Sequence, residues 1–95
     1  MKTKQLRDEK RKFLFVSKWG DSLDVAYGVQ AEGHQVLMYI ADKRSREIGF
    51  GFVKKTNDYK KHVDWADIIV FDYTGFGKES DALRKAGKLV FGGSS

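Results

Sequence analysis

The chain has 95 residues, a formal net charge of +5 and no cysteine. This length fits one domain and is too short for two, and 41% hydrophobic residues are enough to bury a core without disulfides. The absence of cysteine excludes disulfides and thiolate sites, and no apolar run approaches the roughly 18 residues of a membrane span, so we expect a soluble cytoplasmic protein.

The positive charge is concentrated at the N-terminus. Residues 1–12 contain six basic and two acidic side chains and so carry +4, whereas residues 13–95 carry only +1. A nearly neutral domain lacks the clustered basic face that binding to nucleic acid requires. We therefore expect residues 1–12 to form a solvated, disordered tail and residues 13–95 to form the folded domain, with neither nucleic acid nor a membrane as partner.

The first half of the folded domain has the pattern of a βαβ unit. Phe13–Val16 is a short continuous apolar run, which is typical of a strand buried on both faces. Asp21 or Ser22 can cap a helix over residues 22–32, and a glycine follows it. His34–Ile40 then has the composition of a second strand.

Residues 41–66 carry weaker signals. Ile48–Val53 predicts a short edge strand, since its Phe and Val residues favour extended backbone although its glycines weaken it. Asn57 or Asp58 can cap a short helix that places Tyr59, Val63 and Ala66 on one face. His62 borders that face. We expect it to be packed or solvated, because no second histidine or carboxylate is placed to share a metal.

The rest of the chain is organised around one buried strand. Ile68–Phe71 is a continuous run of β-branched and aromatic residues, which predicts a strand at the centre of a parallel sheet. A helix over residues 79–86 and a last strand over residues 88–91 follow it. We expect a fragment of a longer protein, because residues 92–95 come directly after that strand.

These elements predict an α/β domain, namely a Rossmann-like three-layer α/β/α fold with a mostly parallel sheet of four or five strands. The expected strand order is 3-2-1-4-5, which reverses between the Phe13 strand and the Ile68 strand. The loops Lys18–Asp21 and Asp72–Gly75 should then lie side by side. Ligands of such sheets bind in the crevice at that point.

Three common chemistries do not match the residues. A dinucleotide fold needs a Gly-rich turn after its first strand, whereas this turn has one glycine, and only Asp42 lies where a ribose-binding acid would. A receiver-type phosphoacceptor could use Asp72 but needs an acidic pair where the chain has Ser17 and Lys18. No nucleophile, base and orienting group occur together.

The last third of the chain resembles the N-terminal domain of phosphoribosylamine–glycine ligase and related ATP-grasp proteins. The similar residues are Ala66–Asp72 with Gly75 and Gly77, and the run Leu83–Ser94. The resemblance implies a Rossmann-like pre-ATP-grasp domain that binds the acceptor substrate of an ATP-dependent carbon–nitrogen ligase of purine biosynthesis. ATP and Mg²⁺ would bind to downstream domains of the same chain, and this fragment alone would be inactive.

By this resemblance, three loops would hold the acceptor substrate, and no catalytic or metal-ligating residue is assigned. Backbone N–H groups at helix N-termini would donate to the substrate, and one lysine would contact a phosphate. The implied substrate-binding residues are Lys18, Gly20 and Asp21, then Asp72, Tyr73, Thr74 and Gly75, and finally Gly92, Gly93 and Ser94.

Two other functions remain open. The first is a stand-alone small-molecule or nucleotide-binding module of the same topology. The second is an interaction domain whose basic tail docks on an acidic partner. For the loop glycines, turn geometry is an alternative to ligand binding, and for Trp19 and Tyr73 the alternative is packing over the end of the sheet.

Overall fold

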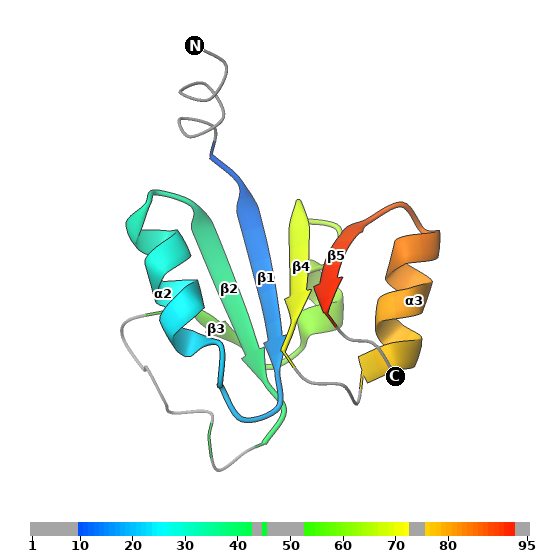
Figure 1. The fold of residues 1–95 in the computed structure, drawn as a ribbon, viewed down its shortest axis with the longest axis horizontal. Helices are drawn as coiled ribbons and strands as arrows, with labels where there is room; N and C mark the ends of the chain where they lie inside the picture. The colour runs from blue at the N-terminus through cyan, green and yellow to red at the C-terminus, as the bar shows by residue number, and fades with distance from the viewer. Residues whose placement is uncertain (1–9, 43–44, 46–52, 73–75, 93–95) are drawn as a thin grey trace.

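The structure is a computed structural model, and it describes residues 10–42, 45, 53–72 and 76–92. Five parallel strands form one sheet in the order β3-β2-β1-β4-β5 (Figure 1). The elements in chain order are β1 Lys12–Ser17, α2 Leu23–Ala31, β2 Gln35–Ile40, β3 Lys55–Thr56, the 3₁₀ helix η2 Tyr59–His62, β4 Ile68–Phe71, α3 Gly77–Lys85 and β5 Leu89–Gly92. The predicted fold class and strand order are confirmed.

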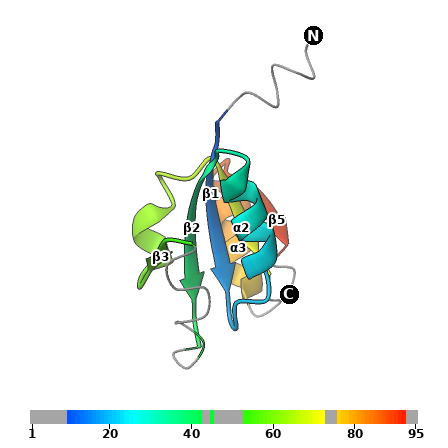
Figure 2. The same cartoon turned by 90° about the vertical axis from the view of Figure 1, so that its left-hand side faces the viewer.

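Helical segments cover the two faces of the sheet. Ala26 of α2 packs with one cluster of buried side chains, whereas Tyr59 of η2 and Leu83 of α3 pack with the other. Figure 2 shows α2 and the green segment around η2 on opposite sides of the strands. The chain is therefore a three-layer Rossmann-like domain. No helix in its described part is long and apolar enough to cross a membrane.

Side chains of both central strands pack into core clusters on both faces, as their continuous apolar sequences predict, although Val70 of β4 is only half-buried. In β1, Leu14 and Val16 belong to the cluster beneath η2 and α3, and Phe15 belongs to the cluster beneath α2. All three are at most 1% exposed. In β4, Ile69 faces the first of these clusters and Val70 faces the second. This two-sided burial explains why neither strand shows polar–apolar alternation.

The edge strand β3 lies outside the predicted segment. The residues before Val53 in that segment are outside the described residues, and Val53 is buried but belongs to no strand. The strand found is Lys55–Thr56, which pairs with Met38 and Tyr39 of β2. Two polar residues carry no strand signal, because this pairing is made by the backbone.

Helix α3 also differs from its prediction. It begins at Gly77 rather than at Glu79, and its fully buried positions are Gly77 and Ser80. Of the apolar residues expected on one face, only Leu83 packs against the core, while Ala82 and Ala86 are exposed. Close packing near the start of the helix favours small residues such as Gly77 and Ser80. A prediction of the buried face from hydrophobic residues alone overlooks them.

On the face covered by α2, the strands β4 and β5 have no helix over them (Figure 1). Leu89 and Phe91 are each 53% exposed there.

The glycines after the two helices behave as predicted, because Gly33 and Gly87 adopt φ values of 100° and 90°. Only glycine adopts this backbone region readily, so each of them lets the chain turn back toward the sheet.

Ile69 provides a test of the core. It is 0% exposed. Ile69→Ala should lower the free energy of unfolding by about 2–5 kcal/mol, because it removes buried methyl groups and leaves a cavity. The measurement is urea denaturation followed by circular dichroism. Ile68→Ala, at the half-buried neighbour, is the control and should cost less; an equal cost would contradict the assigned burial.

Tyr59 connects η2 to an aromatic cluster at the carboxyl ends of β2 and β4. Its ring centroid lies 5.1 Å from that of Tyr39 and 6.2 Å from those of Phe71 and Phe76. Burial raises the pKa of the Tyr59 phenol, and the neighbouring Glu79 carboxylate raises it further, followed by Tyr39 and Asp58. The folded state therefore holds the Tyr59 proton more tightly than the unfolded chain does.

The shifted pKa of Tyr59 predicts a loss of stability at alkaline pH. Above the unfolded-state pKa of about 10, unfolding releases the Tyr59 proton, so the free energy of unfolding should fall as the pH rises. Tyr59→Phe should remove this part of the decline in denaturation curves recorded from pH 8 to 11. Tyr27→Phe still contains Tyr59 and should keep the decline. Identical pH profiles for the parent chain and Tyr59→Phe would contradict the prediction.

Candidate functional site

The loop after β1 is a tight turn closed by a buried serine. The backbone N–H of Gly20 donates to Ser17 Oγ at 2.6 Å, and Ser17 is fully buried. Gly20 has a φ of 86°, which favours glycine, and its carbonyl accepts from the N–H of Leu23 at 3.1 Å. The loop therefore satisfies its own backbone groups as it leads into α2.

Asp72 joins this loop to the end of β4. The Asp72 N–H donates to the carbonyl of Val16 at 3.1 Å, which extends the pairing of β1 with β4 by one residue. Its Oδ2 accepts from the N–H of Ser22 at 2.8 Å. The Lys18–Ser22 loop and the start of the β4–α3 loop consequently lie side by side at the predicted switch point, which confirms the predicted juxtaposition.

The cap of α2 differs from the sequence prediction. Ser22 occupies the N-cap position, but its hydroxyl makes no capping hydrogen bond. Ser22 Oγ is buried and has no hydrogen-bond partner within the described part of the chain. The carboxylate of Asp72 instead accepts a backbone N–H at the positive end of this helix. The buried hydroxyl of Ser22 at the start of α2 is therefore left for another polar group to contact.

The side chains on the first loop reach its outer surface. Lys18 Nζ lies 5.0 Å from the centre of the Trp19 ring, within the range of a cation–π contact, and Trp19 is 42% exposed. The Lys18 carbonyl accepts from the N–H of Asp42 at 2.8 Å, so the ends of β1 and β2 are also connected. Asp21 is exposed. The structure thus gathers Lys18, Gly20, Asp21 and Asp72 of the predicted site at one edge.

Gly92 lies at the same carboxyl edge, at the end of β5. Its φ is 74°, and a Cβ atom there would overlap the carbonyl oxygen of Phe71. The close approach of β5 to β4 therefore requires glycine, which accounts for this residue without a ligand. The remaining predicted site residues, Tyr73, Thr74, Gly75, Gly93 and Ser94, lie outside the described residues.

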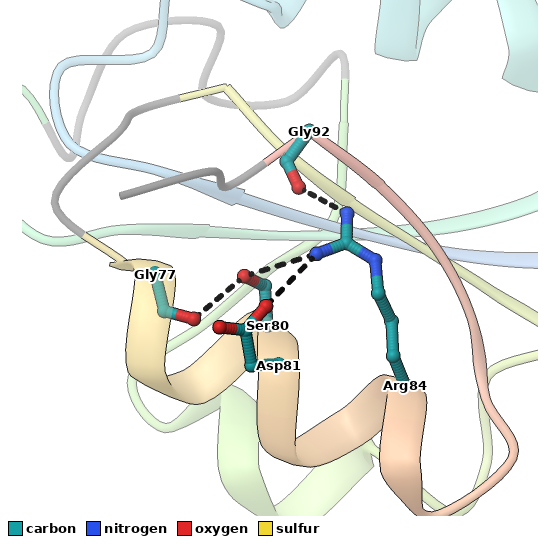
Figure 3. A network of polar contacts seen from close by, with 5 residues as sticks. All are labelled: Gly77, Ser80, Asp81, Arg84 and Gly92. Carbon is teal, nitrogen blue, oxygen red and sulfur yellow. Dashed lines mark hydrogen bonds and ion pairs between the residues drawn. The ribbon is translucent and has the colours of Figure 1, made fainter.

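Arg84 is a polar residue at this edge that the sequence did not indicate. Its Nη2 donates to the Gly92 carbonyl at 2.6 Å, and its Nη1 contacts Ser80 Oγ at 3.4 Å and Asp81 Oδ1 at 3.5 Å (Figure 3). Ser80 Oγ also donates to the Gly77 carbonyl at 3.0 Å. The guanidinium ties α3 to the end of β5. Arg84 lies four residues after Ser80 and three after Asp81, spacings at which side chains on a helix meet. Its contact with Gly92 depends on the tertiary fold.

No group of three or more His, Asp or Glu side chains that could hold a metal ion occurs within residues 10–42, 45, 53–72 and 76–92. Among the described polar groups at the carboxyl edge are one carboxylate engaged with a backbone N–H, one hydroxyl without a described partner and one lysine over an indole ring. Such an arrangement can bind a ligand by hydrogen bonds. It does not assemble a nucleophile with a base.

No family model matches the sequence, and no curated protein matches it. Among solved structures, the chain is similar to shikimate dehydrogenase from Aquifex aeolicus, with a TM-score of 0.64 and 18% sequence identity. The match covers 90% of this chain and 43% of that chain, so this chain spans less than half the length of its structural neighbour. At this identity the similarity shows the Rossmann-like fold and not an activity.

This comparison corrects the function drawn from the sequence. The prediction of an acceptor-binding domain of an ATP-grasp ligase in purine biosynthesis is contradicted: no family model or curated protein matches, and the solved structure that is similar in fold is a shikimate dehydrogenase and not an ATP-grasp ligase. The Rossmann-like fold fits the alternative function, a small-molecule or nucleotide-binding module. The resemblance to the N-terminal domain of phosphoribosylamine–glycine ligase is supported by neither sequence comparison and stays a prediction.

The assignment of Asp72 as the cap of α2 can be tested by two truncations. Asp72→Ala should lower the free energy of unfolding by about 1 kcal/mol, the usual effect of losing a helix cap. Ser22→Ala should cost less than Asp72→Ala, because the serine hydroxyl has no partner to lose. Urea denaturation of both variants measures the difference. A larger cost for Ser22→Ala would show that the serine is the cap.

Proposed function

We propose that the chain is a Rossmann-like module that binds a small, non-phosphorylated molecule in the crevice between the Lys18–Ser22 loop and Asp72. The ligand would present a hydroxyl or amine hydrogen to the Asp72 carboxylate and a second polar group to the Ser22 hydroxyl. The observation that carries the proposal is the hydrogen bond from Ser22 N–H to Asp72 Oδ2 beside an unpartnered buried hydroxyl. A cytoplasmic location fits such a module.

The occupied N-terminus of α2 supports a ligand without phosphate. In Rossmann-type sheets a pyrophosphate is usually bound by backbone N–H groups and the dipole of the first helix. In this chain three N–H groups at this point are already engaged, since Gly20 donates to Ser17 Oγ, Ser22 donates to Asp72 and Leu23 donates to the Gly20 carbonyl. An incoming phosphate would also meet the negative charge of Asp72, which disfavours it at short range.

A nucleoside is a suitable probe because its sugar carries neighbouring hydroxyls. In ¹⁵N-labelled protein, adenosine should shift the amide signals of Gly20 and Ser22. Asp72→Asn should weaken adenosine binding about tenfold, the usual scale for a hydrogen bond to a charged group. Asp64→Asn changes the same charge at an exposed position outside the crevice and should leave binding unchanged.

Phosphorylated ligands provide the opposing result. Mg-ATP and NAD should bind more weakly than adenosine at the Gly20 and Ser22 amides, because they add negative charge beside Asp72. If either ligand bound there more tightly than adenosine, the helix N-terminus would be a phosphate site. The proposal would then be overturned in favour of a nucleotide-phosphate module.

A further inference from the structure

A cavity lies at the opposite edge of the sheet, where the strands begin. Its volume is about 520 Å³, which is within the usual range for small-molecule sites. It is lined by residues of β2 and β3, the end of α2, and the segment from η2 to Trp65. No residue of the crevice described above lines it, so this cavity is a separate site.

Beside this cavity, only part of β2 pairs with the short strand β3. β3 pairs only with Met38 and Tyr39, and the earlier residues of β2 have no partner in β3. The N–H of Gln35 points toward β1, where it donates to Arg11 at 3.0 Å. Because backbone groups alternate along a strand, the N–H of Val36 points to the other side, toward the cavity that Val36 lines.

The charged groups around this cavity are of one sign. Lys54 and Lys55 line it together with His34 and His62, and none of the described lining residues is acidic. These two histidines are the only ones in the sequence, and 27 residues separate them, so no local pattern connects them. His62, expected to be packed or solvated, therefore lines a cavity with a second histidine.

The orientation of His34 is fixed by its neighbours. Its Nδ1 accepts from the N–H of Arg11 at 3.0 Å, which leaves Nε2 as the donor of the ring. The edge of the ring packs on Phe13, with a centroid distance of 5.3 Å. A positioned donor of this kind suits recognition of an anion. Among the described residues, no third group that could hold a metal ion joins this pair.

Trp65 supplies a planar apolar surface at the same cavity. Its side chain is half-buried and packs against the core cluster that contains Tyr59 and Leu14, so its position is held by the fold. Aromatic side chains bind planar ligands by stacking while donors at the rim fix their polar groups.

From these groups we infer a second ligand site, which takes an aromatic oxyanion: a planar ring that carries a phosphate or carboxylate. The ring lies against Trp65, and the oxyanion is bound by Lys54, His62 and the adjacent donors. This inference is independent of the proposed function, since it uses none of the residues of the crevice between Lys18–Ser22 and Asp72.

Phenyl phosphate is the probe, with phenol and inorganic phosphate as partial ligands. The two tryptophan indole N–H signals of the ¹⁵N-labelled chain, assigned with Trp19→Phe, report the two edges of the sheet separately. Phenyl phosphate should shift the Trp65 indole and the Val36 amide, and should leave the Gly20 and Ser22 amides in place. Phenol and inorganic phosphate should each bind more weakly, because each lacks one of the two contacts.

Variants separate a built site from general attraction by positive charge. Lys54→Met combined with His62→Ala should weaken phenyl phosphate binding about tenfold. Lys61→Met removes a charge from an exposed neighbour of His62 that does not line the cavity, and should change binding little. The single variant Lys54→Met, at an exposed position, gives the same comparison if the double variant does not fold.

Three results would overturn the inference. The first is a Trp65 indole signal that does not move at millimolar phenyl phosphate. The second is a loss of binding in Lys61→Met as large as that in Lys54→Met, which would indicate nonspecific attraction. The third is equal binding of phenol and phenyl phosphate, which would leave the lysines and histidines without a role.

Discussion

Parallel pairing of β1 with β4 is the constraint on which the rest of this structure depends. It places Phe13–Val16 against Ile68–Phe71 in register, and side chains of both strands pack into the two core clusters on either face of the sheet. The strand β2 lies on the other side of β1 from β4. The helix that follows β1 therefore packs on one face of the sheet, and the helix that follows β4 packs on the other. The loops after β1 and β4 then meet at the carboxyl edge, where open α/β sheets bind ligands. The position of the candidate site thus follows from the strand order.

Asp72 determines the chemical character of this candidate site. In a sheet of this type the first helix would normally offer its N-terminus to an anion from outside. Here an aspartate from the neighbouring strand supplies that anion, so the helix is stabilised without a ligand. The same hydrogen bond leaves the Ser22 hydroxyl buried and unpartnered. The fold is Rossmann-like, and similarity of fold to a dehydrogenase does not transfer a cofactor site.

The two candidate sites bring together different polar groups. At the carboxyl edge, a carboxylate occupies the switch point between β1 and β4. At the amino edge, two lysines and two histidines line a cavity beside the short strand β3. The net charge of +1 for residues 13–95 reveals neither arrangement. Local electrostatics are decided by placement, which a composition does not record.

The sequence by itself determined four of the five strands, the glycines that end the two α-helices and the strand order. Continuous apolar runs at Phe13–Val16 and Ile68–Phe71, with glycines at 33 and 87, leave few alternatives to a doubly wound parallel sheet, since parallel crossovers are right-handed. The tertiary structure decided which polar groups meet. Asp72 reaches the N–H of Ser22 across 50 residues of chain, and His34 reaches the cavity of His62. It also decided the place of β3 and the need for glycine at position 92. Local sequence patterns record how each segment buries its own surface, whereas these contacts depend on which segments pack together.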